Sequence, residues 1–209
     1  FVWLVLVSVL ILPAVTKAQT KFKALDAELT NYEYPFPVSF FPVKYKDQSL
    51  KMAYMLVKPS GSVSANGKTV VLLHGKNFSG FYWDKTIRDL TAQGYQVLVP
   101  DQIGFGKSSK PEKIQFTFQL LASTTQDLIK SLGINDYLLV GHSMGGMLAT
   151  RMALLYPDSV KKLILVNPIG LEDWKTVVPY KNVDELYKIE LATDETKIRK
   201  YQRDVYFDG

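Results

Sequence analysis

The chain has 209 residues, of which 47% are hydrophobic, and a formal net charge of +5. This length and composition suit one α/β domain with a buried core and exclude a disordered or fibrous chain. The absence of cysteine excludes disulfides, thiolate metal sites and cysteine nucleophiles, and the presence of only two histidines argues against a multi-histidine metal site. The positive charges form no run of five, so we expect no nucleic-acid partner.

Residues 1–18 are predicted to be a secretory signal peptide. Residues 1–12 are almost continuously apolar, Pro13 interrupts this run, and residues 16–18 offer a cleavage site after Ala18. The run is shorter than the roughly 20 residues of a membrane-spanning helix, although an uncleaved N-terminal membrane anchor is the alternative. We therefore expect an exported protein, periplasmic or secreted, with no stable membrane span after cleavage. Because no methionine and no basic segment precede the run, we expect the sequence to begin inside an open reading frame.

The next part of the chain has the pattern of strands. Residues 38–41 and 51–57 predict an antiparallel pair joined by a turn at residues 46–48. A loop rich in glycine and serine is expected at residues 60–67, and it leads into the apolar run 69–73. That run, like residues 95–99 later in the chain, is typical of parallel strands buried on both faces. Residues 162–166 are expected to form the next strand, closed by Asn167 and Pro168.

Two crossover helices are predicted between these strands. One presents apolar side chains at helical spacing over residues 83–90 and should end at Gly94. The other presents such a face over residues 121–132 and should end at Gly133. We interpret both apolar faces as core that packs on the sheet, not as a cofactor site.

A serine lies at the tip of a predicted strand-to-helix turn. The segment Gly141-His142-Ser143-Met144-Gly145-Gly146 follows the apolar run 137–140 and precedes a helical pattern at residues 147–155. This is the nucleophile elbow G-x-S-x-G, in which the turn strains the serine backbone and the glycines let strand and helix approach closely. Ser143 is therefore the candidate nucleophile, and the alternative is a glycine-rich turn that carries an idle serine.

Two further motifs follow predicted strands. His74-Gly75 comes after residues 69–73, and a D-x-x-G-x-G-x-S motif comes after residues 95–99. The residues of the second motif are Asp101, Gly104, Gly106 and Ser108. In this order, with the elbow, the motifs resemble the α/β-hydrolase fold family over roughly residues 38–170, and specifically its serine-nucleophile members, which include esterases and proline iminopeptidases.

The resemblance implies an α/β fold with a mostly parallel twisted sheet and crossover helices on both faces. It implies a hydrolase core at residues 19–170 and the start of a helical cap, or lid, at residues 171–209, after the sixth strand. We expect cap helices at residues 184–191 and 193–206, capped by Asp184 and Thr193 respectively. We also expect the last strands of the family fold to lie outside this chain.

The resemblance also implies roles for the motif residues. The backbone N–H groups of Met144 and Lys76, with Asn77 as the alternative to Lys76, would form the oxyanion hole. We expect the Lys76 side chain to reach solvent, with attraction of an anionic substrate as the alternative. Structural roles are implied for the remaining motif residues: His74 and Gly75 in the oxyanion loop, Asp101, Gly104, Gly106 and Ser108 in the second motif, and Gly141, Gly145 and Gly146 in the elbow.

The usual general base of such a site is absent from this sequence. The family order is Ser, then Asp or Glu, then His, but no histidine follows Ser143. We expect His142 to point away from the serine and His74 to be structural, so the triad histidine and acid would lie outside this chain. Glu172 and Asp173 are interpreted as surface carboxylates of the lid, and we expect the 209-residue chain alone to be inactive.

Serine at position 143 also indicates the chemistry. The family members that dehalogenate haloalkanes or open epoxides have an aspartate nucleophile at this position, whereas a serine indicates acyl chemistry. The segment His74-Gly75-Lys76-Asn77 is not glycine-rich, which argues against a peptidase. We therefore predict an exported serine hydrolase that acts on small carboxylic esters through an acyl-serine intermediate, without metal or cofactor. The alternatives are an acyltransferase or peroxidase-type relative and a non-catalytic binding member.

Overall fold

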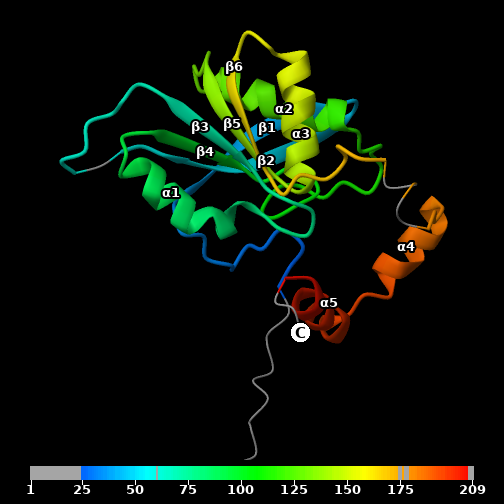
Figure 1. Cartoon of the computed structure of the whole chain (residues 1–209). Helices are drawn as coiled ribbons and strands as arrows, with labels where there is room; N and C mark the ends of the chain where they lie inside the picture. The colour runs from blue at the N-terminus through cyan, green and yellow to red at the C-terminus, as the bar shows by residue number, and fades with distance from the viewer. Residues whose placement is uncertain (1–24, 60, 174–175, 177–178, 207–209) are drawn as a thin grey trace, which may run out of the picture.

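The computed structural model describes residues 25–59, 61–173, 176 and 179–206. The predicted signal peptide, residues 1–18, lies outside this part of the chain. Within the described residues, six strands form one sheet in the order β1-β2-β4-β3-β5-β6 (Figure 1). The strands are β1 Val38–Tyr45, β2 Gln48–Val57, β3 Thr69–Leu73, β4 Gln96–Pro100, β5 Tyr137–His142 and β6 Val160–Val166.

The direction of the strands agrees with the predicted sheet. β1 pairs antiparallel with β2, and β2 pairs antiparallel with β4. β3 lies parallel between β4 and β5, and β5 pairs parallel with β6. The mostly parallel α/β fold is therefore confirmed, and the antiparallel opening pair is also confirmed.

The helices before β6 connect the strands and cover both faces of the sheet, whereas the last two described helices follow β6. They are the 3₁₀ helix Gly80–Trp83, α1 Asp84–Thr91, α2 Phe118–Ser131, α3 Met144–Leu155, α4 Val183–Leu191 and α5 Glu195–Tyr206. The first two crossover helices end before Gly94 and Gly133, which take the positive φ values of 83° and 71°. None of the helices that the structure describes is long and apolar enough to span a membrane.

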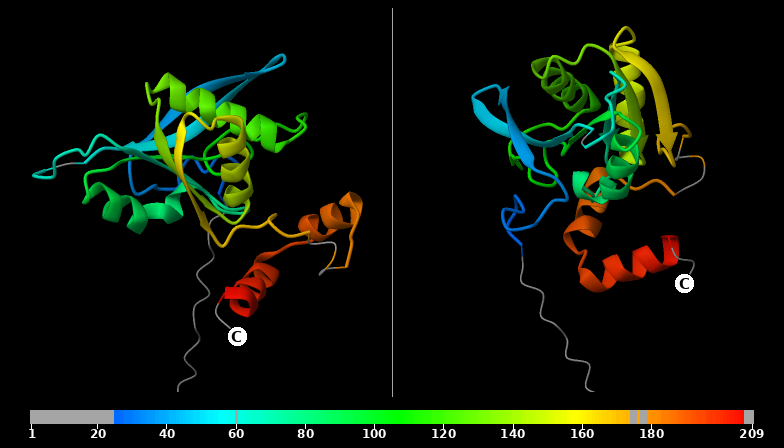
Figure 2. Two further views of the ribbon diagram at one scale, coloured as in Figure 1. Left: turned by 45° about the horizontal axis from the view of Figure 1, so that its top comes forward. Right: turned by 90° about the vertical axis from the view of Figure 1, so that its left-hand side faces the viewer.

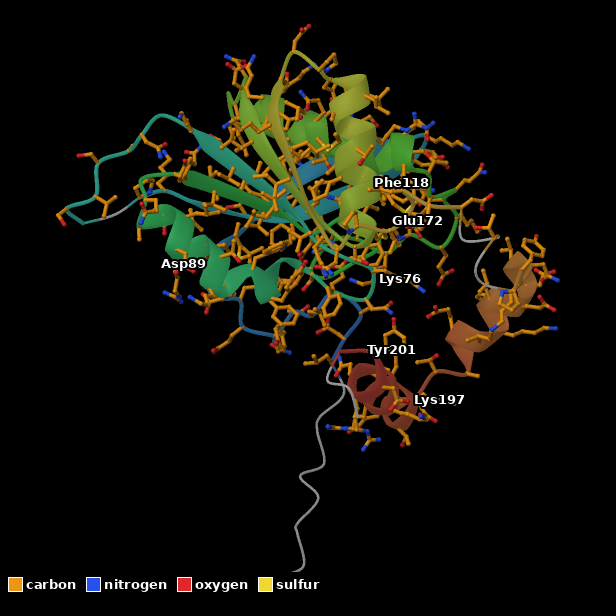
Figure 3. The ribbon with its side chains drawn as sticks, viewed as in Figure 1. Lys76, Asp89, Phe118, Glu172, Lys197 and Tyr201 are labelled. Atoms are coloured by element: carbon orange, nitrogen blue, oxygen red, sulfur yellow. The ribbon has the colours of Figure 1, made fainter. Side chains whose placement is uncertain are left out.

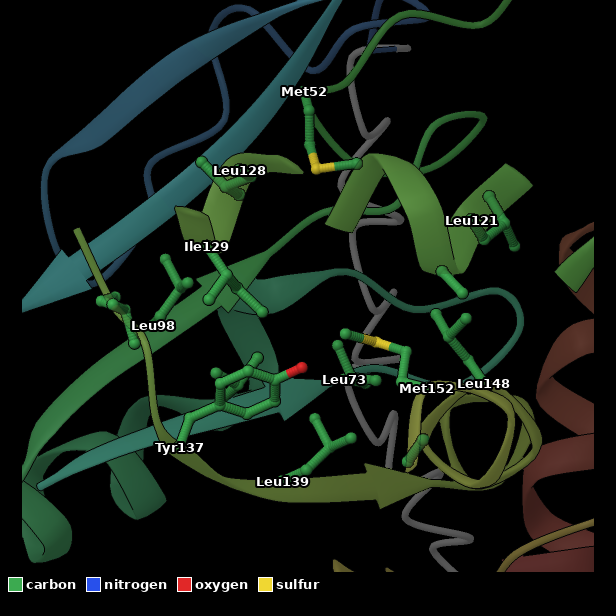
Figure 4. Packing of buried hydrophobic residues seen from close by; sticks show 14 of the residues in the cluster. Met52, Leu73, Leu98, Leu121, Leu128, Ile129, Tyr137, Leu139, Leu148 and Met152 are labelled. Carbon is green, nitrogen blue, oxygen red and sulfur yellow. The ribbon is translucent and has the colours of Figure 1, made fainter. Parts of the chain in front are cut away.

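Each face of the sheet has its own apolar core, because successive strand residues point to opposite sides. On one face, side chains of α2 and α3 pack on β2, β3, β4 and β5, and Leu73, Leu98 and Leu139 are fully buried there (Figure 4). On the other face, Trp83 and Ile87 pack against Val70, Leu72, Val97 and Val99. β3 is buried along its whole length, so the loop that follows it is held by a rigid strand.

The cap helices stand apart from the sheet (Figures 1 and 2). Both helices lie close to the predicted ranges, but their predicted caps are wrong. Asn182 forms a capping box with Glu185 at the start of α4. The Asp194 side chain accepts from Lys197 N at 2.8 Å at the start of α5. Asp184 lies inside the first turn of α4, and the Thr193 hydroxyl donates to the preceding helix at Ile189 O, so neither side chain caps a helix.

Candidate active site

Ser143 occupies the strained turn between β5 and α3. Its backbone has φ 54° and ψ −118°, a conformation that costs about 1–3 kcal/mol for a residue other than glycine. The surrounding backbone holds it there: Ser143 N donates to Val166 O of β6 at 3.1 Å, and Gly146 N donates to Ser143 O at 2.9 Å. The strained serine backbone predicted for the elbow is present, and it is held by backbone hydrogen bonds within the protein.

The glycines of the elbow allow α3 to contact the sheet directly. A Cβ atom placed on Gly145 would lie 2.3 Å from the carbonyl oxygen of Leu73, and one placed on Gly141 would lie 2.2 Å from the carbonyl oxygen of Gly145. On Gly146 it would lie 2.6 Å from the Cβ atom of Pro168. Helix and strands therefore touch through backbone, which fixes the position of Ser143 relative to β3.

The loop after β3 lies beside the serine. A Cβ atom placed on Gly75 would lie 3.2 Å from the Cβ atom of Ser143. Phe78 N donates to Gly75 O at 3.3 Å, which closes a turn over Lys76 and Asn77, and Asn77 has φ 64°. Met144 is the first residue of α3, where a backbone N–H has no partner within the helix. The loop after β3 and the first residue of α3 thus both lie next to Ser143, and their role as an oxyanion hole stays a prediction.

The Lys76 side chain does not simply reach solvent. Its ammonium group forms an ion pair with the carboxylate of Glu190 on α4, and both side chains are about half exposed. Figure 3 shows Lys76 on the side of the core that faces the cap. The ion pair therefore links the predicted oxyanion loop to the cap. Glu172 and Asp173 are both exposed, after the end of β6.

His74 is fully buried, and both of its ring nitrogens are engaged. Gln102 N donates to Nε2 at 3.0 Å, so Nε2 is the acceptor and Nδ1 carries the proton. Nδ1 then donates to the carbonyl oxygen of Gly75 at 2.9 Å. Burial lowers the pKa of this imidazole and keeps it neutral. His74 joins the loops after β3 and β4, a geometry that fits the structural role implied for it.

His142 lies in a cluster of aromatic rings. Its Nδ1 is 3.0 Å from the hydroxyl of Tyr82, and its ring packs edge-on against Tyr82 and Trp83. Partial burial lowers its pKa. No hydrogen bond found among the described residues joins the Ser143 hydroxyl to either histidine. The hydrogen bonds of both histidines are thus with groups other than the Ser143 hydroxyl, which fits the roles expected of them.

Asp101 is the centre of the second motif and is almost fully buried. One carboxylate oxygen accepts from Gly80 N at 2.6 Å, and the other accepts from Lys107 N at 2.8 Å and from the Tyr34 hydroxyl at 2.6 Å. Burial and the adjacent carboxylate raise the pKa of Tyr34. Tyr34 belongs to a segment without a motif, so the sequence contains no local signal for this bond.

The other residues of the second motif complete this loop. The Ser108 hydroxyl donates to Asp101 O at 2.7 Å and accepts from Ala53 N of β2 at 2.8 Å. Gly104 and Gly106 have φ values of 95° and 52°, and a Cβ atom on Gly106 would lie 2.1 Å from the Asp101 carboxylate. The loop is thus tied to the sheet by its own side chains.

A cavity of about 480 Å³ is lined by Met144, the residue after the serine, and by residues between positions 104 and 121. A second cavity, of about 460 Å³, is lined by residues between positions 28 and 51 and by Lys107, and it includes no elbow residue. In the part of the chain that the structure describes, no group of three histidine, aspartate or glutamate side chains could hold a metal ion.

A parallel sheet with a serine at a strand-to-helix elbow, beside the loop of a neighbouring strand, defines a class of hydrolase-like α/β proteins. Comparison with known families agrees, because the model of the alpha/beta hydrolase fold matches residues 68–199. The chain belongs to the α/β-hydrolase fold family. Its likeness to the proline iminopeptidases within that family stays a prediction.

Known proteins similar to this chain include several hydrolases. A haloalkane dehalogenase of Mycolicibacterium paratuberculosis is 32% identical over 145 residues, which are 68% of this chain and 46% of that protein. The bifunctional epoxide hydrolase 2 of Sus scrofa is 31% identical over 131 residues, which are 60% of this chain and 24% of that protein. The crystal structure of a probable hydrolytic enzyme of Pseudomonas aeruginosa PAO1 is 48% identical and superimposes with a TM-score of 0.81, over 86% of this chain and 57% of that one. The chain thus spans 24% to 57% of the length of these relatives.

Proposed function

We propose that this chain is the nucleophile-bearing part of a serine hydrolase that cleaves carboxylic esters through an acyl-serine intermediate. The observation that carries the proposal is the geometry of Ser143, a non-glycine residue held at φ 54° with the oxyanion-loop residue Gly75 against its side chain. A strained position of this kind is maintained only where the surrounding structure requires it. We propose that this strain places the hydroxyl group beside the backbone N–H groups of Met144 and Lys76.

The reaction proposed for this geometry begins when Ser143 Oγ attacks the ester carbonyl carbon and its proton passes to a general base. The carbonyl oxygen becomes an oxyanion, which accepts from the backbone N–H groups of Met144 and Lys76. Collapse of this intermediate breaks the bond to the alcohol, which leaves with the proton from the base. Water then attacks the acyl-serine, releases the acid and restores the hydroxyl group of Ser143.

Two of the similar proteins are named for cleavage at an alkyl carbon, as a haloalkane dehalogenase and an epoxide hydrolase. A carboxylate nucleophile suits that chemistry because the alkyl ester that it forms can be hydrolysed at the acyl carbon. A serine that attacked an alkyl carbon would form an ether, which water does not cleave under these conditions. Ser143 therefore favours an acyl substrate for this chain, although these relatives act on other bonds.

The general base is proposed to come from residues other than those of this sequence. Both histidines are engaged in the loops around the elbow. The exposed apolar side chains Leu163, Ile164 and Val166 lie on β6, which forms the edge of the sheet within the described residues. We propose that a further strand pairs with β6 in the whole protein, and that the triad acid and histidine lie in the chain that continues from that strand. Export directed by residues 1–18 is part of the same proposal.

The proposal is tested with the whole protein and p-nitrophenyl esters. We expect Ser143→Ala to lower kcat by about 10⁴-fold or more, since the loss of a serine nucleophile removes the covalent pathway. A fluorophosphonate should label the wild type at Ser143, which peptide mass spectrometry detects, and should leave the variant unlabelled. Ser131→Ala is the matched control, because that hydroxyl only donates to Leu128 O near the end of α2.

Three results would contradict the proposal. Ester hydrolysis that persists in Ser143→Ala would exclude this serine as the nucleophile. Wild-type protein that is folded, does not react with the fluorophosphonate and hydrolyses no ester would favour the non-catalytic alternative. Release of halide from a haloalkane by the wild type, without any esterase activity, would show that the inference from serine to acyl chemistry is wrong.

A further inference from the structure

The cavity beside the elbow has an apolar wall. Its carbon-rich lining consists of Phe105, Pro111, Phe116, Phe118, Leu121 and Met144. Apart from Met144, these side chains come from one stretch of chain, which runs from the loop after β4 to the first turn of α2. The volume of about 480 Å³ lies within the range of cavities that bind small molecules.

The polar groups at this cavity are already engaged by the protein. The Lys110 ammonium group donates to Gly106 O at 2.6 Å and to Ser108 O at 3.2 Å. The Thr117 side chain accepts from Leu120 N at 3.1 Å and caps α2. Glu112 is exposed, and its negative charge is opposite to that of Lys110 in the same lining, so the lining has no net charge. The wall therefore offers a ligand mostly carbon surface.

The cavity is joined to the elbow on two sides. Met144 lines it and is also the residue whose N–H is proposed to bind the oxyanion. On the other side, the Phe105 ring packs edge-on against His74, with 5.3 Å between centroids. His74 in turn donates to Gly75, which lies against Ser143. A group bound in the cavity would thus lie next to a carbonyl carbon held at Ser143.

We propose that this cavity is the acyl pocket of the esterase and that it selects uncharged aliphatic or aromatic acyl groups over polar or charged ones. This proposal rests on the proposed function of Ser143. The acyl group remains attached to the serine after the alcohol has left, so the pocket that adjoins the nucleophile is the one that holds it. Phe116 lines this pocket and is 46% exposed, and a Cβ atom placed on Gly104 would lie 3.1 Å from its ring.

The test compares p-nitrophenyl acetate, butanoate and hexanoate with the whole protein, so that only the acyl chain changes. Burial of each methylene in an apolar pocket should raise kcat/KM about fourfold per added CH₂ group. Phe116→Ala should lower the ratio of the kcat/KM values for hexanoate and acetate about tenfold, because part of the wall is removed. Phe40→Ala is the matched control, since Phe40 is 49% exposed on β1 and Phe116 is 46% exposed.

A second measurement does not depend on turnover. Calorimetric titration of Ser143→Ala with octanamide, a neutral unreactive analogue, should give an affinity that the added Phe116→Ala substitution weakens about tenfold, while added Phe40→Ala leaves it unchanged. Far-UV circular dichroism of every variant should match the wild type, which keeps a folding defect from imitating the effect.

The outcomes separate the two proposals. If Ser143→Ala abolishes hydrolysis but the wild type shows no rise with chain length, or Phe116→Ala leaves the ratio unchanged, the acyl pocket is refuted and the serine hydrolase stands. If hydrolysis persists in Ser143→Ala while octanamide binding depends on Phe116, the proposed function fails and an apolar ligand site at this cavity is supported. If octanamide binding does not depend on Phe116, the assignment of the cavity is wrong.

Discussion

The carboxylate of Asp101 allows a quantitative test of how the loops around the elbow are held. It accepts from Gly80 N, Lys107 N and the Tyr34 hydroxyl at 2.6, 2.8 and 2.6 Å. Asp101→Asn keeps the shape of the side chain but replaces one acceptor with an NH₂ group. In either orientation of the new amide, that NH₂ group faces a backbone donor, which is Gly80 N or Lys107 N. One amide of an almost fully buried site is then left without an acceptor.

The cost of this substitution follows from the bonds that are lost. A buried donor without an acceptor costs about 1–3 kcal/mol, and loss of the charge on the remaining bonds adds about 1 kcal/mol. We therefore expect Asp101→Asn to lower the free energy of unfolding by about 2–4 kcal/mol. Tyr34→Phe removes a single bond to the carboxylate and should cost about 1.5 kcal/mol. Both substitutions act on the bond between Tyr34 and Asp101. The double variant should therefore lose less free energy of unfolding than the two single variants lose together.

Urea unfolding of the whole protein, followed by tryptophan fluorescence, measures these differences in the free energy of unfolding. The variants can be compared when the slope of that free energy against urea concentration is the same for all of them. Asp89→Asn is the control, because it removes the same charge from an exposed pair with Lys85 on α1. Such an i,i+4 pair is worth about 0.3–0.5 kcal/mol. If Asp101→Asn costs no more than Asp89→Asn, the three bonds do not hold the loop and the reasoning is refuted.

Two other predictions concern the same region. Burial lowers the pKa of His74, so this residue takes up a proton in the unfolded chain before it does so in the folded protein as the pH falls. The free energy of unfolding should therefore be constant above about pH 6.5 as far as His74 is concerned. Below that pH it should decrease by up to about 1.4 kcal/mol per pH unit. Urea unfolding at pH 7, 6 and 5 should show a steeper decrease for the wild type than for His74→Gln, and equal slopes would contradict the assignment. Gly145→Ala should cost about 3 kcal/mol or more in the same assay, because its methyl group would meet the Leu73 carbonyl oxygen. Gly133→Ala, where φ is 71° in open space, should cost about 1 kcal/mol, and an equal cost for both variants would contradict the steric argument.

The parts of this protein that could be predicted from sequence are those with a local pattern. The short apolar runs predicted the buried strands, since a strand covered on both faces needs apolar side chains at every position. The G-x-S-x-G spacing predicted the strained turn at Ser143 because glycine is required where helix and strand backbones touch. The starts of the helices were less predictable. Asn182 and Asp184 are both good capping residues, and only the capping box with Glu185 shows that Asn182 caps α4.

Contacts between distant segments could not be predicted in this way. The bond from Tyr34 to Asp101 joins residues 67 positions apart, and the ion pair between Lys76 and Glu190 joins residues 114 positions apart. Neither partner has a sequence pattern that names the other. The cavity near Met144 likewise depends on how the loop after β4 folds back over α2, although Phe105 and Phe116 are visible as aromatic residues in the sequence. The motifs therefore indicate the reaction site, whereas its surroundings come only from the fold.

The exposed edge of β6 has a consequence for handling this chain as a separate protein. Unpaired strand edges with apolar side chains are templates for association between copies. Lys161 and Lys162 place charge near the start of β6, and Lys161 pairs with Asp136, but the stretch from Leu163 to Val166 has no such protection. Copies of the isolated chain would therefore join edge to edge as their concentration rises, and charged residues introduced at Leu163 or Ile164 would keep them apart.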